Sequence, residues 1–195
     1  MLLYMGESTN IERPGYTMSE AVVGETLERL VGENNTRRVI IATFASNVHR
    51  LQQIIDIAVR HKRRVALNGR SMLNVVDAAQ KLGELHIPDG VLVDISRTRN
   101  LRDDEVLIVC TGSQGEPMSA LHRMANGENP ALSVGSNDTI IISASPIPGN
   151  ERDVYGVINK LYHLGADVVY ERLENIHVSG HACREEHKIM HTLLK

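Results

Sequence analysis

The chain has 195 residues, of which 42% are hydrophobic and 23% are charged, enough sequence for one domain with a buried core. Aromatic residues make up only 3%, so the core must be built from aliphatic side chains. The net charge of −3 excludes a broad basic surface that attracts nucleic acid without local contacts. Two cysteines, Cys110 and Cys183, are too few for a disulfide framework and predict a cytoplasmic protein. Residues 1–10 lack the basic flank and cleavage site of a signal peptide, and no membrane contact is expected.

Short apolar runs alternate with stretches of helical period along the whole chain. Strands are expected at 2–5, 38–44, 64–67, 91–95, 105–110, 138–143 and 167–170. Helices are expected at 17–31, 47–61, 71–83, 117–127, 150–165 and 183–195, the first capped by Ser19 and the third starting at Ser71. The alternation predicts an α/β fold, a mostly parallel sheet with helices on both faces, formed by residues 1–195 as a single domain.

Small polar residues follow the predicted strands on the way into the helices. The segments are GESTN (6–10), TFASN (43–47), NGRS (68–71), TGSQGEP (111–117), SASPIPGN (143–150) and HVSGHA (177–182). In an open parallel sheet these loops share the carboxyl edge, where backbone N–H groups, hydroxyls and helix N-termini bind anions. The six together indicate a polyanion or nucleotide site, although each alone is also an ordinary strand-to-helix turn. Neither G-x-G-x-x-G nor a P-loop occurs, so no dinucleotide or ATP site is indicated.

Two histidine pairs with the same spacing occur near the C-terminus. His187 and His191 lie on a predicted helix, but no acidic residue or third ligand accompanies them, so surface histidines are the expected reading. His177 and His181 lie in a strand-to-loop segment, where i, i+4 spacing does not place them on one helix face. No metal site is therefore expected in this chain.

The alternative for His181 is acid chemistry beside a phosphate. A neighbouring carboxylate favours the imidazolium, which can protonate a leaving oxygen. Glu7, at the end of the first predicted strand, is the expected partner on the same sheet edge. A structural His–Glu hydrogen bond without chemistry is an equally open reading.

In this order the motifs resemble the β-CASP domain of ribonuclease J, a Rossmann-like insertion in metallo-β-lactamase-fold ribonucleases that process and degrade RNA. The resemblance is carried by GESTNIERPGYTMSE, ATFASNVHRLQQ, LNGRSMLN, TGSQGEPMSALHRMANG, SASPIPGNE and NIHVSGHACREE, which span essentially the whole chain. It implies that Glu7 is the motif A carboxylate, commonly Asp in the family, and that His181 is the motif B histidine. The substrate-binding residues that the loops and the resemblance together indicate are His177, Ser179, Gly180, Phe44, Ala45, Ser46, Asn47, Ser143, Ser145, Arg70 and Ser113.

The resemblance also implies what lies elsewhere. The family holds two zinc ions with H-x-H-x-D-H and further motifs of the metallo-β-lactamase domain, none of which occurs here, and its motif C histidine comes about twenty residues after motif B. The chain is therefore expected to be an inserted domain excised from a larger zinc-dependent 5′-to-3′ exoribonuclease and endoribonuclease, and to be inactive alone. Expected partners are single-stranded RNA with a 5′-monophosphate end, the protein's own metallo-β-lactamase domain and further copies of the parent protein.

Two other functions stay open at this point. One is a non-catalytic α/β module that binds nucleotides or proteins through the polar loops. The other is a phosphotransferase or hydrolase that uses Glu7 and His181 without metal, which requires turnover by this chain alone.

Overall fold

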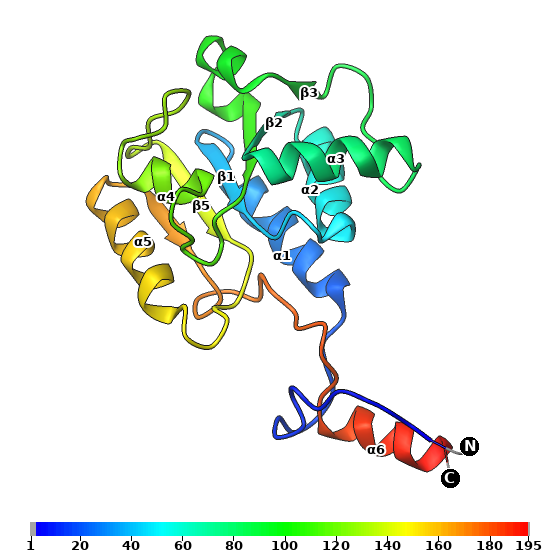
Figure 1. Ribbon diagram of the computed structural model, residues 1–195. Coiled ribbons are helices and arrows are strands. Elements are labelled where there is room, and N and C mark those ends of the chain that lie inside the picture. Colours follow the sequence, from blue (N-terminus) through cyan, green and yellow to red (C-terminus); the bar gives the residue numbers. More distant parts are fainter. Residues whose placement is uncertain (1–2, 195) are drawn as a thin grey trace.

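A six-stranded, all-parallel sheet forms the centre of the computed structural model, which describes residues 3–194 (Figure 1). The strand order is β3-β2-β4-β1-β5-β6, and each neighbouring pair is parallel. The strands are β1 Arg38–Ala42, β2 Arg64–Asn68, β3 Leu92–Val93, β4 Val106–Cys110, β5 Asp138–Ile142 and β6 Asp167–Val169. The prediction of a parallel α/β fold is confirmed.

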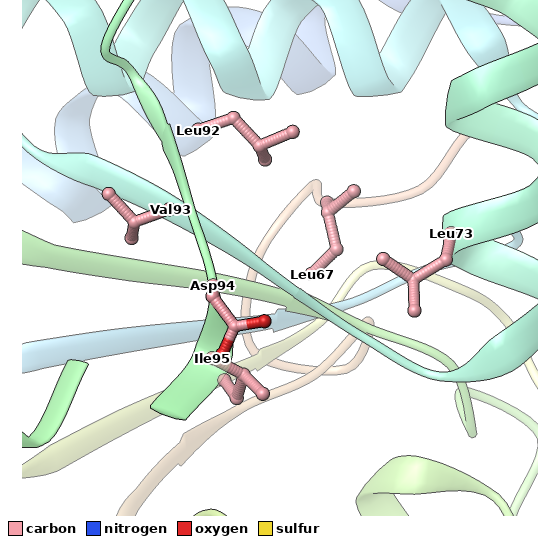
Figure 2. Close-up of a pocket in the computed structure, with 6 residues that line it drawn as sticks. All are labelled: Leu67, Leu73, Leu92, Val93, Asp94 and Ile95. Carbon is pink, nitrogen blue, oxygen red and sulfur yellow. The ribbon is translucent and has the colours of Figure 1, made fainter. Parts of the chain in front are cut away.

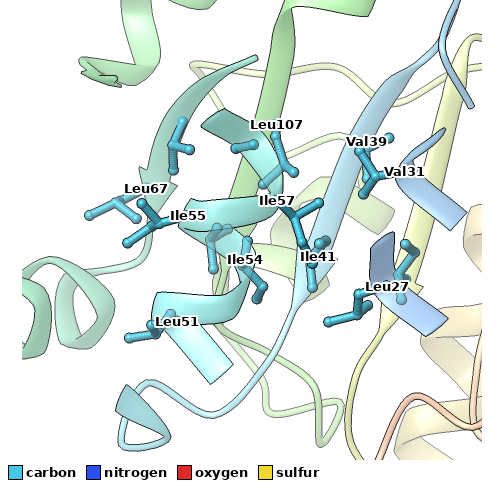
Figure 3. Packing of buried hydrophobic residues seen from close by; sticks show 14 of the residues in the cluster. Leu27, Val31, Val39, Ile41, Leu51, Ile54, Ile55, Ile57, Leu67 and Leu107 are labelled. Carbon is cyan, nitrogen blue, oxygen red and sulfur yellow. The ribbon is translucent and has the colours of Figure 1, made fainter. Parts of the chain in front are cut away.

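Helices cover both faces of the sheet. They are α1 Glu20–Glu33, α2 Val48–Arg60, α3 Arg70–Lys81, α4 Ala120–Ala125 and α5 Glu151–His163. A sixth helix, α6 Arg184–Leu193, lies apart from the sheet (Figure 1), and two 3-10 turns are η1 Ile95–Asn100 and η2 Asp103–Glu105. Apolar side chains of α1, α2 and α3 pack on one face, and those of α4 and α5 on the other. Figure 3 shows the first cluster, where Leu27 of α1 and Ile54 of α2 lie against Ile41.

The burial of the central strands explains why their sequences are continuously apolar and do not alternate between apolar and polar residues. Every residue of β4 and β5 is buried, because helices exclude water from both sides of a parallel sheet. Each buried aliphatic side chain contributes roughly 1.5–3 kcal/mol of transfer free energy. Helix α1 begins after Ser19, whose hydroxyl accepts a hydrogen bond from the N–H of Ala21, as the sequence predicts. Helix α3 begins at Arg70, one residue before the expected start at Ser71, and its N-cap is Gly69.

The two ends of the chain lie side by side and project from the sheet (Figure 1). We call residues 3–19 and 178–194 the extension and residues 20–177 the body. In the extension, Asn10 forms an isolated parallel bridge with Cys183, and the N–H of Arg184 donates to the carbonyl of Arg13 at 2.9 Å. Helix α6 packs against residues 3–19, with the ring centroid of Tyr4 6.0 Å from that of His191.

The expected strand at 2–5 is wrong for residues 3–5, which form no strand, and Leu2 lies outside the described residues. An apolar run becomes a strand only where a partner strand takes its backbone groups, and this run lies beside α6 instead. The segment GESTN therefore does not follow a strand of the sheet. Four of the other polar segments directly follow β1, β2, β4 and β5, which run parallel and end at one edge of the sheet. The segment HVSGHA begins only at His177, after the turn that follows β6, and leads through the extension toward α6.

Candidate functional site

Glu7 and His181 contact each other in the extension. The Oε2 atom of Glu7 lies 3.3 Å from Nδ1 of His181, and the side chains are 45% and 55% exposed. Glu7 also accepts a 2.7 Å hydrogen bond from the N–H of Thr9, and this bond is the main reason why the pKa of the carboxyl lies below its usual value. The structure brings the pair together, but through contact between the chain ends and not at the sheet edge. Its catalytic role stays a prediction.

Asn10 holds the two segments of the extension in register. Its side-chain Nδ2 donates to Ser179 Oγ at 2.9 Å and to the carbonyl of His181 at 3.2 Å, and the residue is buried. The backbone N–H of His181 donates to the same Ser179 oxygen at 3.1 Å. A hydroxyl has two acceptor positions and one donor, so these two bonds use its acceptor positions. The O–H of Ser179 has no acceptor within residues 3–194 and can donate to a ligand. Sequence reasoning missed Asn10, although it ends the GESTN motif.

A buried polar network lies in the body beside the points where the extension begins, and it centres on Arg50, which is 0% exposed. Its guanidinium forms two bonds to the Glu20 carboxylate, at 2.7 and 2.8 Å, and donates to the carbonyl of Ser143 at 2.8 Å. A fourth contact, of 3.3 Å, joins it to Nδ1 of His177. Buried charges persist only when they are paired and hydrogen-bonded, as here. Sequence reasoning missed Arg50; the available signal was an arginine on the same helix stripe as Ile54.

The Arg50 contact fixes the hydrogen-bonding role of His177. Burial, and next the Arg50 charge, lower the pKa of His177, so the ring is neutral near neutral pH. Since guanidinium groups only donate, Nδ1 must accept in this contact, and the neutral ring carries its proton on Nε2. The Nε2 atom of His177 therefore carries a hydrogen, so it can donate a hydrogen bond and cannot accept a proton.

A cleft of about 230 Å³ separates the extension from the body. We call it the extension cleft; its lining includes Asn10, Arg13, Ser145, Glu171, His177 and Ser179. Ser145 hydrogen-bonds to the Glu171 carboxylate, and its carbonyl accepts from Gln114 Nε2 at 2.8 Å. The charge is mixed, because Glu171 and Glu174 accompany Arg13. An anion in this cleft therefore depends on specific donors and not on a general positive field.

Other predicted residues lie away from this cleft or inside the protein. Ser143 and Ser113 are buried, and Ser143 Oγ donates to the carbonyl of Ile176 at 2.7 Å. Contact of Ser143 or Ser113 with a substrate stays a prediction, and it requires a change that exposes these buried side chains. Asn47 caps α2 by accepting from the N–H of Arg50 at 3.1 Å. Phe44 and Ala45 are half-buried, Ser46 and Gly180 are exposed, and Arg70 lies at a second cleft between β2 and β4.

The second histidine pair lies on α6, and the structure also bears on metal binding. His187 of α6 is 9% exposed, so the expectation of a surface histidine is wrong for it, while His191 is exposed. Among residues 3–194, no three His, Cys, Asp or Glu side chains are grouped to hold a metal.

A hollow of about 330 Å³ at the β3 edge is lined by five aliphatic side chains and Asp94 (Figure 2), and this apolar lining does not suit a phosphate. No helix in the described part of the chain is long and apolar enough to cross a membrane.

These features define an α/β domain whose parallel strands end at a polar edge and whose chain ends carry a paired carboxylate and histidine. The family model described as "Ribonuclease J, beta-CASP domain" matches residues 36–161, and the chain belongs to this family. It is 46% identical over its whole length to ribonuclease J of Synechocystis sp. and 43% identical to ribonuclease J 1 of Streptococcus pyogenes. Ribonuclease J of Thermus thermophilus is 46% identical over 97% of the chain. The chain covers 30%, 35% and 33% of these relatives, about a third of their length.

Proposed function

We propose that residues 1–195 form the single β-CASP domain of a ribonuclease, inserted in a metallo-β-lactamase-fold protein that cleaves RNA as a 5′-to-3′ exonuclease and as an endonuclease. Support comes from the family match and from three relatives that carry the name ribonuclease J. The observation that carries the proposal is the arrangement of Ser179 and His181 on one segment, positioned by Asn10 and facing Glu7.

In this proposal the extension cleft holds phosphate oxygens of single-stranded RNA. The free O–H of Ser179 and Nε2–H of His177 are neutral donors, and Arg13 supplies the positive charge. His181, oriented by Glu7, gives its proton to the oxygen that leaves phosphorus when water attacks and the P–O bond breaks. The proton passes to the leaving strand, and water supplies the new oxygen on phosphorus.

Two zinc ions would supply the activated water in the whole protein. The described residues offer no group of ligands for them, so we assign the ions to the remainder of the protein, and no step assigned to this chain depends on their geometry. The chain alone is then expected to bind RNA without cleaving it. Because its two cysteines are unpaired, we assign the protein to the cytoplasm, where thiols stay reduced and RNA is processed and degraded.

The extension is the surface that we propose packs against the metallo-β-lactamase domain. Leu3, Met5 and Leu193 are 72%, 84% and 73% exposed, and a groove of about 580 Å³ runs between Ile11 and α6. Apolar side chains gathered on one projection mark an interaction surface. The relatives are about three times longer than this chain and so include sequence that can cover it. Contacts between copies of the parent protein are assigned to that additional sequence.

The test uses short RNAs with a 5′-monophosphate, a 5′-hydroxyl or a 5′-triphosphate, with binding measured by fluorescence anisotropy. We expect the monophosphate RNA to bind most tightly and Ser179→Ala to weaken it by roughly tenfold, the usual effect of losing a hydrogen bond to a charged group. Ser136→Ala, in the turn before β5, is the matched control. Equal affinity for the three ends would remove the 5′ pocket. Cleavage by the purified chain with added zinc or manganese would contradict the division of roles proposed here.

A further inference from the structure

A second polar cleft lies at the carboxyl edge, between the loops that follow β2 and β4. It encloses about 690 Å³, and we call it the Arg70 cleft. Strand β2 leads into α3 on one face of the sheet, whereas its neighbour β4 leads into α4 on the other. Adjacent connections that leave toward opposite faces open a crevice, and ligands of α/β sheets bind in such crevices. The cleft therefore lies at the kind of position where α/β sheets bind ligands, and its lining residues belong to the body and not to the extension.

The two loops that wall the cleft approach each other too closely for side chains at the crossing. Gly69 has φ +122°, and a Cβ there would lie 2.5 Å from Oγ1 of Thr111. A left-handed glycine at the N-cap of α3 also means that no side chain caps this helix. The N-terminal N–H groups of α3 and its partial positive charge are left for a ligand.

Unpaired donors line the same space. The Arg70 side chain has no hydrogen bond or ion pair within residues 3–194, and Arg123 makes one 3.3 Å contact, to the carbonyl of Glu128. The Nδ2 atom of Asn68, at the end of β2, is buried and has no acceptor among the residues that the structure describes. A buried donor is stabilised when a ligand oxygen accepts from it. Glu116 is the one carboxylate among the lining residues, against two arginines.

We infer that the Arg70 cleft binds an internal phosphate of the same RNA strand whose end occupies the extension cleft. A planar guanidinium binds two phosphate oxygens at once, which suits Arg70 at the mouth of the cleft. Ser145 of the extension cleft follows β5, and the Arg70 cleft lies between β2 and β4. Neighbouring strands are about 4.8 Å apart, so the Arg70 cleft lies roughly 12 Å from β5 along the sheet edge, a distance that a few nucleotides of single-stranded RNA span. The inference rests on the proposed function and deepens it: it gives the RNA a path along the strand ends.

The experiment compares two 5′-monophosphate RNAs, a dinucleotide too short to reach the Arg70 cleft and a decanucleotide. The variants are Arg70→Gln and, as the matched control, Lys62→Gln, which removes one exposed positive charge at the opposite edge of the sheet. We expect Arg70→Gln to weaken decanucleotide binding by about tenfold and to leave dinucleotide binding unchanged. It should also reduce the salt slope of decanucleotide binding by about 0.7, the value for one lost single-strand phosphate contact.

The other possible outcomes separate a failure of this inference from a failure of the proposed function. Equal effects of Arg70→Gln and Lys62→Gln on the decanucleotide overturn the inference, while dinucleotide binding that Ser179→Ala abolishes leaves the proposed function standing. If Arg70→Gln weakens the dinucleotide, or uridine monophosphate alone, as much as the decanucleotide, the cleft is a mononucleotide site and the strand path is wrong. If the wild-type chain binds neither RNA, the proposed function fails as well.

Discussion

The body and the extension are stabilised by different interactions. In the body, helices α1 to α5 cover a parallel sheet whose central strands are fully buried, so apolar packing decides the structure. In the extension, hydrogen bonds of Asn10, Thr17 and Glu186 join the chain ends, while Leu3, Met5 and Leu193 remain exposed. The comparison teaches that the Glu7–His181 pair lies on the part of the molecule with less apolar packing, where local opening is expected to be easier.

The largest effect is expected in the body, at Arg50, whose partners Glu20 and His177 are the first and last residues of the body. Arg50→Met leaves the Glu20 carboxylate and the Ser143 carbonyl without their partner, and we expect it to lower the free energy of unfolding by roughly 3–5 kcal/mol. Urea unfolding measures the change. The matched control is Arg29→Met, which breaks exposed pairs with Glu33 and Glu174 and should cost less than about 1 kcal/mol. Equal effects would contradict the role of Arg50 as the central residue of the network.

A pair of apolar truncations tests the contrast in packing directly. Ile54→Ala leaves a cavity between α2 and the sheet, with an expected loss of about 2–5 kcal/mol. Leu193→Ala, on the exposed side of α6, should change the free energy of unfolding by no more than about 0.5 kcal/mol. The same urea experiment measures both. A large effect of Leu193→Ala would show that α6 is packed within this chain and needs no partner.

Asn10→Ala tests whether hydrogen bonds alone hold the extension. Its two bonds to the segment 179–181 are each worth roughly 0.5–1.5 kcal/mol, so hydrogen exchange in residues 178–186 should accelerate while exchange in β1 and β4 stays unchanged. Mass spectrometry of peptic peptides gives the readout. Asn100→Ala, at an exposed position of η1, is the control and should change neither. Faster exchange throughout the body would mean that the two parts unfold as one unit.

The lowered pKa of His177 predicts a pH dependence at the junction. The folded protein binds this proton less tightly than the unfolded chain, whose histidine has its ordinary pKa of 6.5. The stability that neutral His177 contributes to the folded protein is fully present above pH 6.5, and it is lost as the pH falls through the lowered pKa of His177 in the folded state. Glu7 and Glu186, whose lowered pKa values start from 4.5, lose their contributions only in more acid solution.

Urea unfolding at pH 7.5 and 5.5 tests this assignment. The wild type should lose stability between the two values, and His177→Asn should lose less. The control is His49→Asn, at an exposed position of α2, which should keep the wild-type difference. If His177→Asn loses as much stability between pH 7.5 and 5.5 as the wild type, the pH dependence belongs to another group.

The smallest effect concerns affinity at the extension cleft. Glu171 contributes a negative charge to a cleft proposed to bind phosphate. Glu171→Gln should strengthen binding of the 5′-monophosphate RNA by about two- to fivefold, the size expected for one partly screened charge. Anisotropy titrations at low and physiological salt measure the gain, which should shrink with salt. Glu105→Gln, at the opposite edge of the sheet, should leave the affinity unchanged; weaker binding in Glu171→Gln would argue against an anion in this cleft.

Much of the body could be predicted from the sequence. Apolar runs such as 105–110 and helical stripes such as that of Leu27 and Leu30 depend on local periodicity, which reports burial directly. The run at 2–5 misled because periodicity cannot tell whether a partner strand exists. Arg50 and His187 were missed as buried residues for a related reason: burial of a polar side chain depends on distant partners.

The sequence by itself determined the α/β layering, the positions of the polar loops and the motifs that place the chain in its family, because these depend on residues close to one another along the chain. Only the tertiary structure decided that Glu7 meets His181 outside the sheet, that Ser143 is buried while Ser179 keeps a free donor, and that Arg70 lies at a cleft of its own. Those facts arise from contacts between segments up to 174 positions apart, whose geometry is set by the packing of the whole molecule and by no local pattern.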